Sequence, residues 1–462
     1  MKSYLDLIEQ TFFFPTPEFR VENNELLFND VPLMPIIEQY GTPLKLTYLP
    51  KISQKIQFAK QIFQEAIQKH NYGKEYIYCY CTKSSHFRFI MEQTLRNGTH
   101  METSSAFDIP IVKQLYHDGK LTKQHYIICN GFKTEQYKQY ISEILLEGFN
   151  CIPILDNLKE IEAYEPLPLE KINLGIRVAT DEEPKFEFYT SRLGIRYNEV
   201  EQFYKQKIAT NPKFRLKMLH FFVNTGIRDT AYYWSEFSRF IYKYCEIKKI
   251  CPDLDSVDIG GGFPIKTSIH FDYNYAYMAE EIVKNIKLIC QKNGVDVPHI
   301  FTEFGSYTVG ESGAIIYSVL DQKLQNDKEC WYMIDGSLIT QLPDIWGLNQ
   351  KYIMLAINNW GNTHQRVNIG GITCDSMDYY SSEAHINAVF LPNFEPHEKQ
   401  YIGFFHTGAY QESLGGYGGI QHCLIPAPKH IIIDRDAQGN LTHTLFAPEQ
   451  TQESMLKILG YL

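Results

Sequence analysis

Residues 76–87 read YIYCYCTKSSHF, a strand pattern followed at once by the start of a helix pattern. The first half is apolar, aromatic and rich in β-forming side chains, which predicts a short buried strand that ends at Lys83. Apolar residues then recur at helical spacing, with Phe87, Ile90 and Leu95 on one face, so a helix should follow. Lys83 should therefore lie at the carboxyl end of a buried strand.

Lys83 has two interpretations at such a position. A lysine at the end of a buried strand loses hydration, which lowers its pKa. A neutral amine in an apolar pocket is the group that forms a Schiff base with an aldehyde cofactor. Alternatively, the side chain reaches out to solvent and has no chemical role. The rest of the chain has to decide between the two.

Length, charge and cysteine content narrow the class of protein. A chain of 462 residues exceeds one typical core, so we expect two domains, one of which could be a large barrel. The net charge of −10 argues against nucleic acid or an anionic membrane as the main partner and favours a cationic substrate. The 10 cysteines fit no zinc spacing, so we predict reduced thiols, a cytoplasmic protein and no metal at the site. We find no signal peptide or membrane span.

Strand-like runs alternate with helical or mixed segments through the first two thirds of the chain. A closed parallel β/α barrel of the TIM type needs eight strands in about 250 residues, and the pattern meets both requirements. The runs cover residues 76–82, 99–102, 126–129, 151–155, 172–178, 216–223, 254–259 and 298–302.

Past residue 310 the pattern changes to aromatic and β-branched runs between turns, which predicts a mostly β domain. We therefore predict three parts: an N-terminal segment (1–45) that partly joins the β domain, a barrel (46–310) and a C-terminal β domain (311–462). The β runs cover residues 313–320, 330–334, 366–369, 401–405 and 430–434.

Polar residues or glycines follow most of the predicted barrel strands. The carboxyl ends of the strands form the active face of such a barrel, although loops are often polar without any function. The chemical types here are complementary, which favours a site. They are Lys83, Glu102, Asn130, Asp156, Arg177, Gly260 to Gly262, and Glu303.

Two of these strand ends suggest a cofactor. A carboxylate such as Glu303 at the end of a buried strand needs either a proton or a cationic partner. That partner could be the protonated nitrogen of a pyridine ring or the guanidinium of Arg177. Gly260, Gly261 and Gly262 could bring backbone amides close to a phosphate, with Gly305 extending the cradle, or could form only a tight turn.

The β domain contributes two further candidates. Cys374 and Asp375 stand between turn residues and could combine a proton donor with a cation-binding carboxylate, although such pairs are usually structural. Tyr410, in a glycine-rich aromatic loop, could donate a hydrogen bond to a phosphate.

Taken together, these residues resemble the fold-type III pyridoxal-phosphate decarboxylases of basic amino acids, which include ornithine, diaminopimelate and biosynthetic arginine decarboxylases. The resemblance covers residues 40–419 and implies an alanine-racemase-like barrel with a β domain. Four segments are most similar to the arginine decarboxylases. They are ICNGFK at 128–133, SL at 337–338 with PDIWG at 343–347, TCDS at 373–376, and GAYQE at 408–412.

The resemblance implies a role for each candidate. Lys83 would carry pyridoxal 5′-phosphate, Glu303 would pair with the pyridine nitrogen, and Cys374 would protonate the α-carbon after carbon dioxide leaves. Asp375 would contact the distal cationic group of a small basic amino acid. In this family the site lies between subunits, so Cys374 and Asp375 would reach the other chain's Lys83, which implies a homodimer or larger assembly. Arg177 would support the Glu303 side of the ring, and the phosphate would be held by Gly260, Gly261, Gly262, Gly305 and Tyr410.

Two positions depart from the family pattern. Phe222 stands where a histidine usually stacks on the cofactor ring, and it can stack but cannot donate a hydrogen bond. Ser306 replaces the arginine that holds the phosphate. Phosphate binding should therefore depend more on backbone amides, Ser306 and Tyr410.

We predict that the chain decarboxylates L-arginine to agmatine, a step of polyamine biosynthesis; diaminopimelate, ornithine and lysine are the alternative substrates. A catalytically silent homologue that regulates a partner through a mixed dimer is an alternative of another class, motivated by Phe222 and Ser306. Lys83, Glu303 and Cys374 are present and argue against it. A barrel enzyme without pyridoxal phosphate that binds a sugar phosphate on its glycines is the third interpretation.

Overall fold

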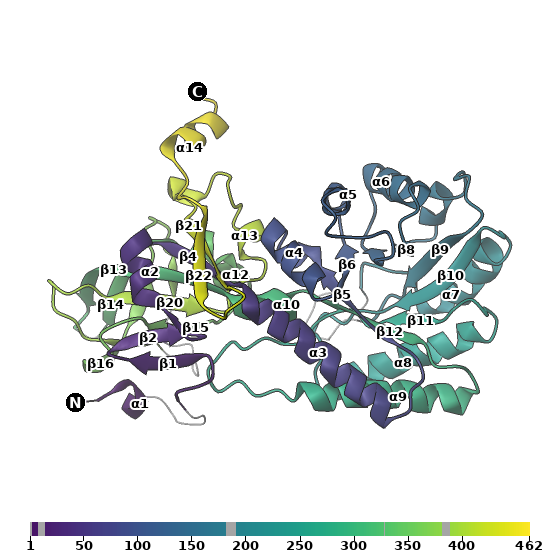
Figure 1. Ribbon diagram of the computed structural model, residues 1–462, viewed down its shortest axis with the longest axis horizontal. Helices are drawn as coiled ribbons and strands as arrows, with labels where there is room; N and C mark the ends of the chain where they lie inside the picture. The colour runs from purple at the N-terminus through teal and green to yellow at the C-terminus, as the bar shows by residue number, and fades with distance from the viewer. Residues whose placement is uncertain (1, 8–13, 182–190, 328, 381–388) are drawn as a thin grey trace. The chain divides into compact units, whose positions relative to one another are not determined.

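The computed structural model forms two compact units, both discontinuous in sequence (Figure 1). The barrel unit comprises Ile52–Pro264 and Tyr273–Thr308. The β unit comprises Met1–Lys51, Ile265–Asp272 and Val309–Leu462. The described residues are 2–7, 14–181, 191–327, 329–380 and 389–462.

The barrel unit contains a closed barrel of parallel strands, in the order β10-β11-β12-β5-β6-β7-β8-β9. Each of the eight predicted runs overlaps one of these strands, so the predicted β/α barrel is confirmed. The strands are β5 (Tyr76–Cys81), β6 (His100–Thr103), β7 (Ile127–Cys129), β8 (Cys151–Leu155), β9 (Ile172–Arg177), β10 (Phe214–His220), β11 (Ser256–Asp258) and β12 (His299–Phe304).

Apolar side chains fill the inside of this barrel. One buried cluster joins residues of β5, β7, β8, β10 and β12, which lie on different sides of the closed sheet. Parallel barrels pack their interiors in this way, so the barrel is a core and its chemistry has to lie at the strand ends. The cluster comprises Ile77, Cys79, Ile128, Ile152, Ile154, Met218 and Phe301.

Helices surround the barrel, and local sequence signals fix several of their ends (Figure 1). Thr134 caps α6 and Thr230 caps α8 by accepting a backbone hydrogen bond, and α9 ends at Gly294, which has a left-handed conformation. The helices are α3 (Leu49–Lys69), α4 (Arg88–Arg96), α5 (Asp108–His117), α6 (Glu135–Leu146), α7 (Tyr197–Phe203), α8 (Ala231–Lys248) and α9 (Tyr275–Asn293).

The β unit is built on a nine-stranded sheet that includes a strand from the N-terminal segment. β4 pairs antiparallel with β13 and parallel with β21. A mostly β second unit is therefore confirmed. Its strands are β4 (Leu44–Tyr48), β13 (Gly313–Gln325), β14 (Glu329–Ile334), β15 (Ile353–Ala356), β17 (Asn368–Gly370), β18 (Tyr379–Tyr380), β20 (Tyr401–Phe405), β21 (Lys429–Arg435) and β22 (Leu441–Ala447).

This sheet is buried on both faces. Ala314 and Ile316 of β13 pack into one apolar cluster, whereas the alternating Ile315 and Tyr317 pack into another. The remaining strands are short and lie outside the nine-stranded sheet. They are β1 (Phe19–Glu22), β2 (Glu25–Phe28), β3 (Val31–Pro32), β16 (His364–Arg366) and β19 (Phe390–Pro392).

Short helices occur in the β unit, and α10 spans the residues at which the chain passes from the barrel unit to the β unit. They are α1 (Tyr4–Leu7), α2 (Leu33–Tyr40), α10 (Ser306–Val309), α11 (Leu338–Gln341), α12 (Pro343–Leu348), α13 (Gln411–Leu414) and α14 (Gln452–Ile458). Across the residues that the structure describes, no helix combines the length and the apolar character that crossing a membrane requires.

Candidate active site

Polar side chains meet at the carboxyl ends of the barrel strands, where a barrel of this kind has its active face. Lys83 lies in the one-turn 3-10 helix η1 (Thr82–Ser84), directly after β5. The other strands place carboxylates, amides and an imidazole at the same end of the barrel. These are Glu102 of β6, Asn130 after β7, Arg177 of β9, His220 of β10, Asp258 of β11 and Glu303 of β12.

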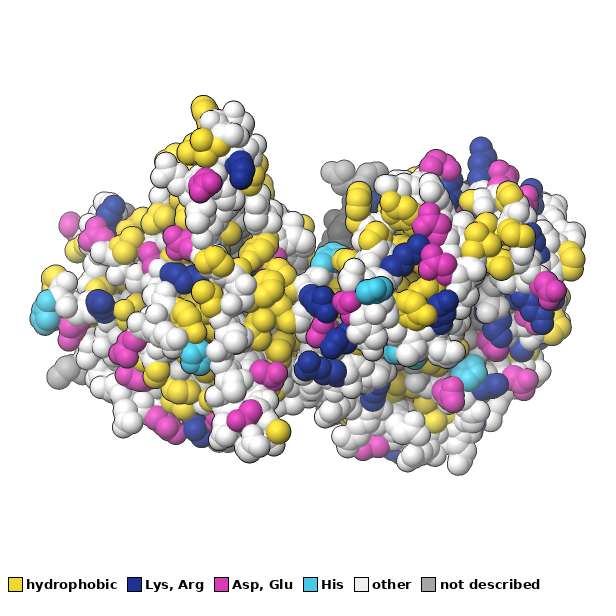
Figure 2. All heavy atoms as spheres, turned by 45° about the horizontal axis from the view of Figure 1, so that its top comes forward, with side chains coloured by type: hydrophobic (Ala, Val, Ile, Leu, Met, Phe, Trp, Pro, Cys, Tyr) yellow, Lys and Arg dark blue, Asp and Glu magenta, His cyan; other side chains and the backbone are white. Residues whose placement is uncertain are grey.

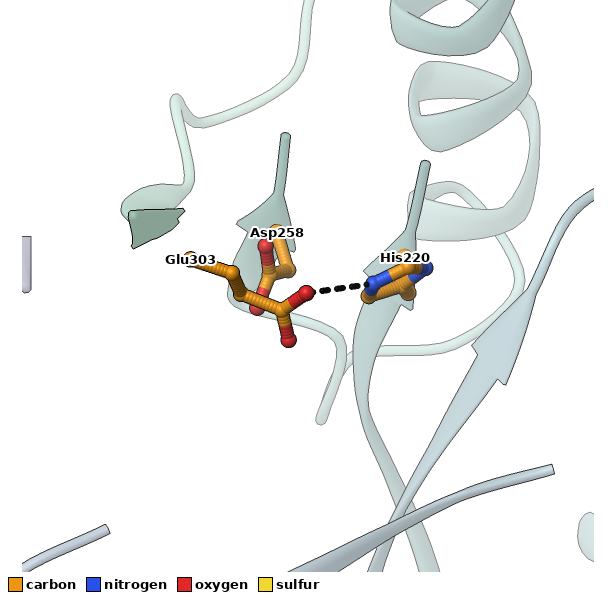
Figure 3. A group of neighbouring side chains, drawn as sticks. All are labelled: His220, Asp258 and Glu303. Carbon is orange, nitrogen blue, oxygen red and sulfur yellow. Dashed lines mark hydrogen bonds and ion pairs between the residues drawn. The ribbon is translucent and has the colours of Figure 1, made fainter. Parts of the chain in front are cut away.

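One ion pair and two hydrogen bonds connect Lys83 to the buried Glu303. The Lys83 Nζ atom lies 3.5 Å from Oε1 of Glu102. The Asn130 amide donates both to Glu102 Oε1 at 3.1 Å and to Glu303 Oε1 at 2.7 Å. On the far side, His220 Nε2 lies 3.1 Å from Glu303 Oε2 (Figure 3). Glu303 is thus held by two nitrogen donors that come from different strands.

The three buried carboxyl groups differ in the direction of their pKa shifts, because their hydrogen bonds and charged neighbours differ. Burial raises the pKa of Glu303, but His220, Lys83 and the Asn130 amide outweigh burial and lower it below its usual range. Burial, followed by the charge of Glu303, raises the pKa of Asp258 well above its usual range. Burial also raises the pKa of Glu102. At neutral pH, Glu303 is therefore ionised, and Asp258 keeps its proton to a higher pH than an ordinary aspartate does.

His220 supports this charge as a neutral ring. Burial lowers its pKa more strongly than the neighbouring Glu303 raises it, so the imidazole is uncharged at neutral pH. The Nε2 atom then carries the ring proton and donates a hydrogen bond to the carboxylate. We therefore attribute the low pKa of Glu303 to nitrogen donors around it rather than to an imidazolium.

His220, Asp258 and Glu303 converge from three adjacent strands (Figure 3). Their potential ligand atoms all lie within 4.8 Å of one another, a spacing that could also hold a metal ion. The His220–Glu303 hydrogen bond already occupies one such atom on each of these two residues. The absence of a metal at the site stays a prediction.

The glycine turn after β11 packs closely against the loop after β10 and against the end of β12. A Cβ atom on Gly261 would lie 2.2 Å from the carbonyl oxygen of Glu303, and one on Gly262 would lie 2.6 Å from the Cα of Gly226. The Gly260 amide donates to Asp258 at 2.8 Å. Within the described parts of the chain, the amides of Gly261 and Gly262 have no hydrogen-bond partner. These two N–H groups are open donors for an anion.

A hydroxyl that the sequence interpretation did not consider lies next to this turn. Thr225 Oγ1 is buried and has no hydrogen-bond partner among the described residues. Its neighbour Gly226 packs against Gly262, and the Ile227 amide donates to the Gly262 carbonyl at 2.9 Å. Buried hydroxyls are normally paired, so Thr225 is a candidate to donate to a bound phosphate.

Arg177 contacts a ring rather than a carboxylate. Its guanidinium lies 5.8 Å from the ring centroid of Phe222, a distance at which a cation and a ring attract. Among the described residues, no ion pair joins Arg177 to Glu303, whereas His220 Nε2 lies 3.1 Å from Glu303 Oε2. Glu303 therefore does not use Arg177 as its direct partner.

Gly305 and Ser306 follow Glu303 at the start of α10. A Cβ atom on Gly305 would lie 1.9 Å from the Ser84 hydroxyl oxygen, so this glycine allows η1 to pack against the end of β12. Ser306 is the first residue of α10 and is only partly exposed. The structure thus brings the segments of Lys83 and Gly305 into direct contact.

The remaining predicted residues lie in the β unit. Cys374 and Asp375 are in a loop after β17, where Cys374 is exposed. His422 lies across from this loop, with Nε2 3.6 Å from Asp375 Oδ2. Tyr410, directly before α13, has a left-handed backbone conformation (φ 67°). The barrel set and this β-unit set therefore belong to different units of the chain.

The barrel set fits pyridoxal phosphate by the chemistry of its donors. Lys83 offers a primary amine to an aldehyde, and the ionised Glu303 suits a protonated pyridine nitrogen. The open amides of Gly261 and Gly262 and the unpaired hydroxyl of Thr225 suit a phosphate. Phe222, with 36% of its surface exposed, offers a face on which a ring can stack.

Comparisons with known proteins agree with this fit. Biosynthetic arginine decarboxylase of Prochlorococcus marinus is 20% identical over 92% of this chain and 83% of its own, and arginine decarboxylase 2 of Arabidopsis thaliana is 20% identical over 91% and 73%. The crystal structure of the biosynthetic arginine decarboxylase of Campylobacter jejuni has a TM-score of 0.82 and 19% identity, over 96% of this chain and 89% of its own.

Diaminopimelate decarboxylase of Helicobacter pylori, complexed with L-lysine, has a TM-score of 0.70 and 17% identity, over 93% of this chain and 99% of its own. These structures show that the fold is shared. The family model described as the pyridoxal-binding domain of pyridoxal-dependent decarboxylases matches residues 54–310, more than half of the chain. Since that match spans the barrel with Lys83, the glycine turn and Glu303, the chain belongs to the pyridoxal-dependent decarboxylases.

Proposed function

We propose that this decarboxylase acts on L-arginine and releases agmatine and carbon dioxide. The observation that carries the proposal is the buried, ionised Glu303 at the barrel end that also holds Lys83 and the glycine turn. The choice of arginine is supported by relatives named arginine decarboxylases that align with more than nine tenths of the chain. The formal charge of −10 also favours a cationic substrate over an anionic one.

Each barrel residue has a defined task in this proposal. When bound, pyridoxal phosphate supplies an aldehyde for the substrate amine and a ring that accepts the electron pair left by carbon dioxide. Lys83 holds the cofactor in place. The Glu303 carboxylate keeps a proton on the pyridine nitrogen, and His220 and Asn130 keep that carboxylate ionised and oriented. Gly261, Gly262 and Thr225 bind the phosphate.

Two residues of the β unit complete the reaction. The Cys374 thiol delivers a proton to the α-carbon after carbon dioxide has left. The neighbouring sulfur of Cys423 raises the pKa of Cys374, which favours the protonated form that a donor needs. The Asp375 carboxylate attracts the guanidinium of the substrate, with which it can form paired hydrogen bonds.

We further propose that the active site is shared between two copies of the chain. The resemblance places Cys374 and Asp375 against the Lys83 of the other subunit. Ile372, Met377 and Leu424 are exposed apolar side chains within three residues of Cys374 or Cys423, and Figure 2 shows apolar side chains at the surface of this unit. Such a surface favours burial against a second copy. The 10 cysteines are all unbridged, which supports a reducing, cytoplasmic location.

The test of the substrate is carbon dioxide release from arginine, ornithine, lysine and diaminopimelate, each with added pyridoxal phosphate. We expect arginine to have the highest kcat/KM and Lys83→Ala to release none. Asp375→Asn should raise KM for arginine more than it lowers kcat. Faster release from another of the four would overturn the named substrate. A protein that takes up the cofactor but decarboxylates none of them would instead be a silent homologue.

A further inference from the structure

Two exposed cysteines face each other in the β unit. The sulfur of Cys374, in the loop after β17, lies 3.6 Å from the sulfur of Cys423, in the 3-10 turn η6 (His422–Leu424). Both are exposed, whereas the other eight cysteines of the chain are buried or half-buried. Within the single chain, this pair is therefore the most exposed thiol pair, and in a shared active site it would be open to small molecules that enter with the substrate.

The surroundings of the pair allow the sulfurs to come together. A disulfide bond is about 2.05 Å long, so the two sulfurs would have to approach by roughly 1.5 Å. Both belong to loops rather than to strands of the sheet, and loops accommodate such shifts more readily than paired strands do. His422 Nε2 also lies 3.6 Å from Asp375 Oδ2, so the same two loops meet at a second point.

We propose that Cys374 and Cys423 are a redox modification site, in which a reversible disulfide disables the enzyme. This inference rests on the proposed function, in which the Cys374 thiol is the proton donor. Once its sulfur is bonded to Cys423, Cys374 has no proton to deliver to the α-carbon. The disulfide would also tether the loop that carries Asp375, so substrate binding should be weakened at the same time.

A peroxide is the oxidant that this chemistry needs. The Cys423 sulfur, as the thiolate, attacks the oxygen–oxygen bond of hydrogen peroxide, which gives a sulfenic acid on Cys423 and, after protonation, one water. The second sulfur then displaces the hydroxyl group as another water and forms the disulfide. Two thiols and one peroxide give one disulfide and two waters, with two electrons passing from sulfur to oxygen. A dithiol such as dithiothreitol reverses the change by thiol–disulfide exchange.

Two other thiol pairs of the chain provide an internal comparison. Cys129 and Cys151 lie 3.6 Å apart on adjacent barrel strands, and Cys245 and Cys290 lie 3.9 Å apart between α8 and α9. All four are buried. Burial denies access to a peroxide, so these pairs should stay reduced while the exposed pair reacts.

The experiment treats the full-length protein loaded with pyridoxal phosphate with increasing hydrogen peroxide. Mass spectrometry of unreduced peptides measures the Cys374–Cys423 link, and carbon dioxide release measures activity before and after dithiothreitol. In wild type and in the control Cys330→Ser, activity should fall as the fraction of linked protein rises. Fully linked protein should have lost activity by on the order of tenfold or more, and dithiothreitol should restore it. Cys423→Ser should form no link and, relative to its own starting activity, be inactivated more slowly.

Inactivated wild type without the Cys374–Cys423 peptide would overturn the proposal, and so would linked protein that keeps its activity. Equal inactivation of Cys423→Ser and wild type at each peroxide dose would overturn it as well. Failure of the proposed function is recognised separately. In that case the reduced, cofactor-loaded protein already releases no carbon dioxide from any basic amino acid. The disulfide would then have no decarboxylase activity to regulate.

Discussion

Glu303 shows how neighbours decide the charge of a buried carboxyl. Glu102, Asp258 and Glu303 are all buried, and burial by itself favours the protonated form of each. Glu303 differs because both of its carboxylate oxygens accept a hydrogen bond, from Asn130 and His220. Its lowered pKa follows from those donors together with the charge of Lys83, and this makes it a suitable partner for a protonated ring nitrogen.

Replacing this carboxylate should affect the chemistry more than cofactor attachment. Glu303→Gln keeps the shape of the side chain but cannot hold the ring nitrogen protonated. We expect kcat for arginine to fall by about 100-fold or more, while the visible absorbance of the bound cofactor persists. The matched control is Glu135→Gln in α6, whose side chain is 93% exposed and should not affect either measurement. Activity of Glu303→Gln within twofold of wild type would contradict the assignment.

At the scale of single residues, the sequence identified those site residues whose side chains are unusual for their position. A lysine and a glutamate at the ends of buried strands stand out, and both lie in the barrel site. His220 did not stand out, because it is one histidine in an apolar strand and its partner is 83 positions away along the chain. Their contact depends on the alignment of β10, β11 and β12, which a single sequence does not reveal. Thr225 was missed for the same reason.

Glycines set how closely the loops after β10, β11 and β12 pack. Gly261 has no room for a side chain, since an added Cβ would lie 2.2 Å from the Glu303 carbonyl oxygen. Gly261→Ala should push the glycine turn away from β12 and weaken cofactor binding by about tenfold, with a loss of about 1–3 kcal/mol in stability. Cofactor titration followed by absorbance measures the first effect, and urea unfolding measures the second.

Gly347 in α12 is the matched control for Gly261, since a Cβ added there would meet no atom within 4 Å. Gly347→Ala should leave cofactor binding and the urea midpoint unchanged. If Gly261→Ala behaved in the same way as this control, the close packing of the turn would be wrong.

A buried histidine should make the stability of the β unit depend on pH. His430 in β21 lies 2.8 Å from Thr47 of β4, and burial lowers its pKa to about 3. In the unfolded chain a histidine binds a proton near pH 6.5. The contribution of His430 to the free energy of unfolding is therefore fully present above pH 6.5 and is lost as the pH falls toward 3. At pH 5 this residue should already have lowered the free energy of unfolding by about 2 kcal/mol.

His430→Gln isolates this effect, because glutamine can keep the contact with Thr47 but does not titrate. Urea midpoints measured between pH 7.5 and pH 5 should decline less steeply for the variant than for wild type. Parallel declines would show that His430 is not buried as a neutral ring.

At the scale of elements, the strands of the barrel were predictable because parallel strands are buried on both faces and read as continuous apolar runs. In the β unit, the ends of the strands were predicted less accurately. β13 continues to Gln325, five residues past the predicted run, because its polar end is held by backbone pairing with β14. The predicted run over 366–369 divides at Val367 into β16 and β17, which pair with different strands.

At the scale of the whole molecule, the candidate residues belong to two units of one chain. Lys83 and Glu303 lie in the barrel unit, whereas Cys374 and Asp375 lie in the β unit. A shared site predicts that two inactive variants can complement each other. Mixed Lys83→Ala and Cys374→Ala subunits should yield mixed dimers with one intact site, and about a quarter of wild-type activity if mixing is random.

Each variant alone is the control for this mixing experiment, and each should stay inactive after the same unfolding and refolding. Activity that never exceeds the sum of the two variants would mean that Lys83 and Cys374 act within one subunit. Sedimentation of the mixture checks that dimers have re-formed.

The division into a barrel and a β unit followed from the change of pattern near residue 310, because each architecture has its own spacing of apolar residues. The contribution of β4 to the central sheet of the β unit was harder to anticipate. Its partners β13 and β21 are more than 250 positions away in sequence, so their pairing is decided by the tertiary fold.

The attachment of pyridoxal phosphate to Lys83 can be measured directly. The purified protein is incubated with the cofactor, reduced with borohydride and digested, and its peptides are mapped by mass spectrometry. We predict a single pyridoxyl adduct, on Lys83 in the peptide that follows β5, with none in Lys83→Ala. A protein that acquires no adduct, or acquires it on another lysine with Lys83 unmodified, would contradict the placement of the active site at this end of the barrel.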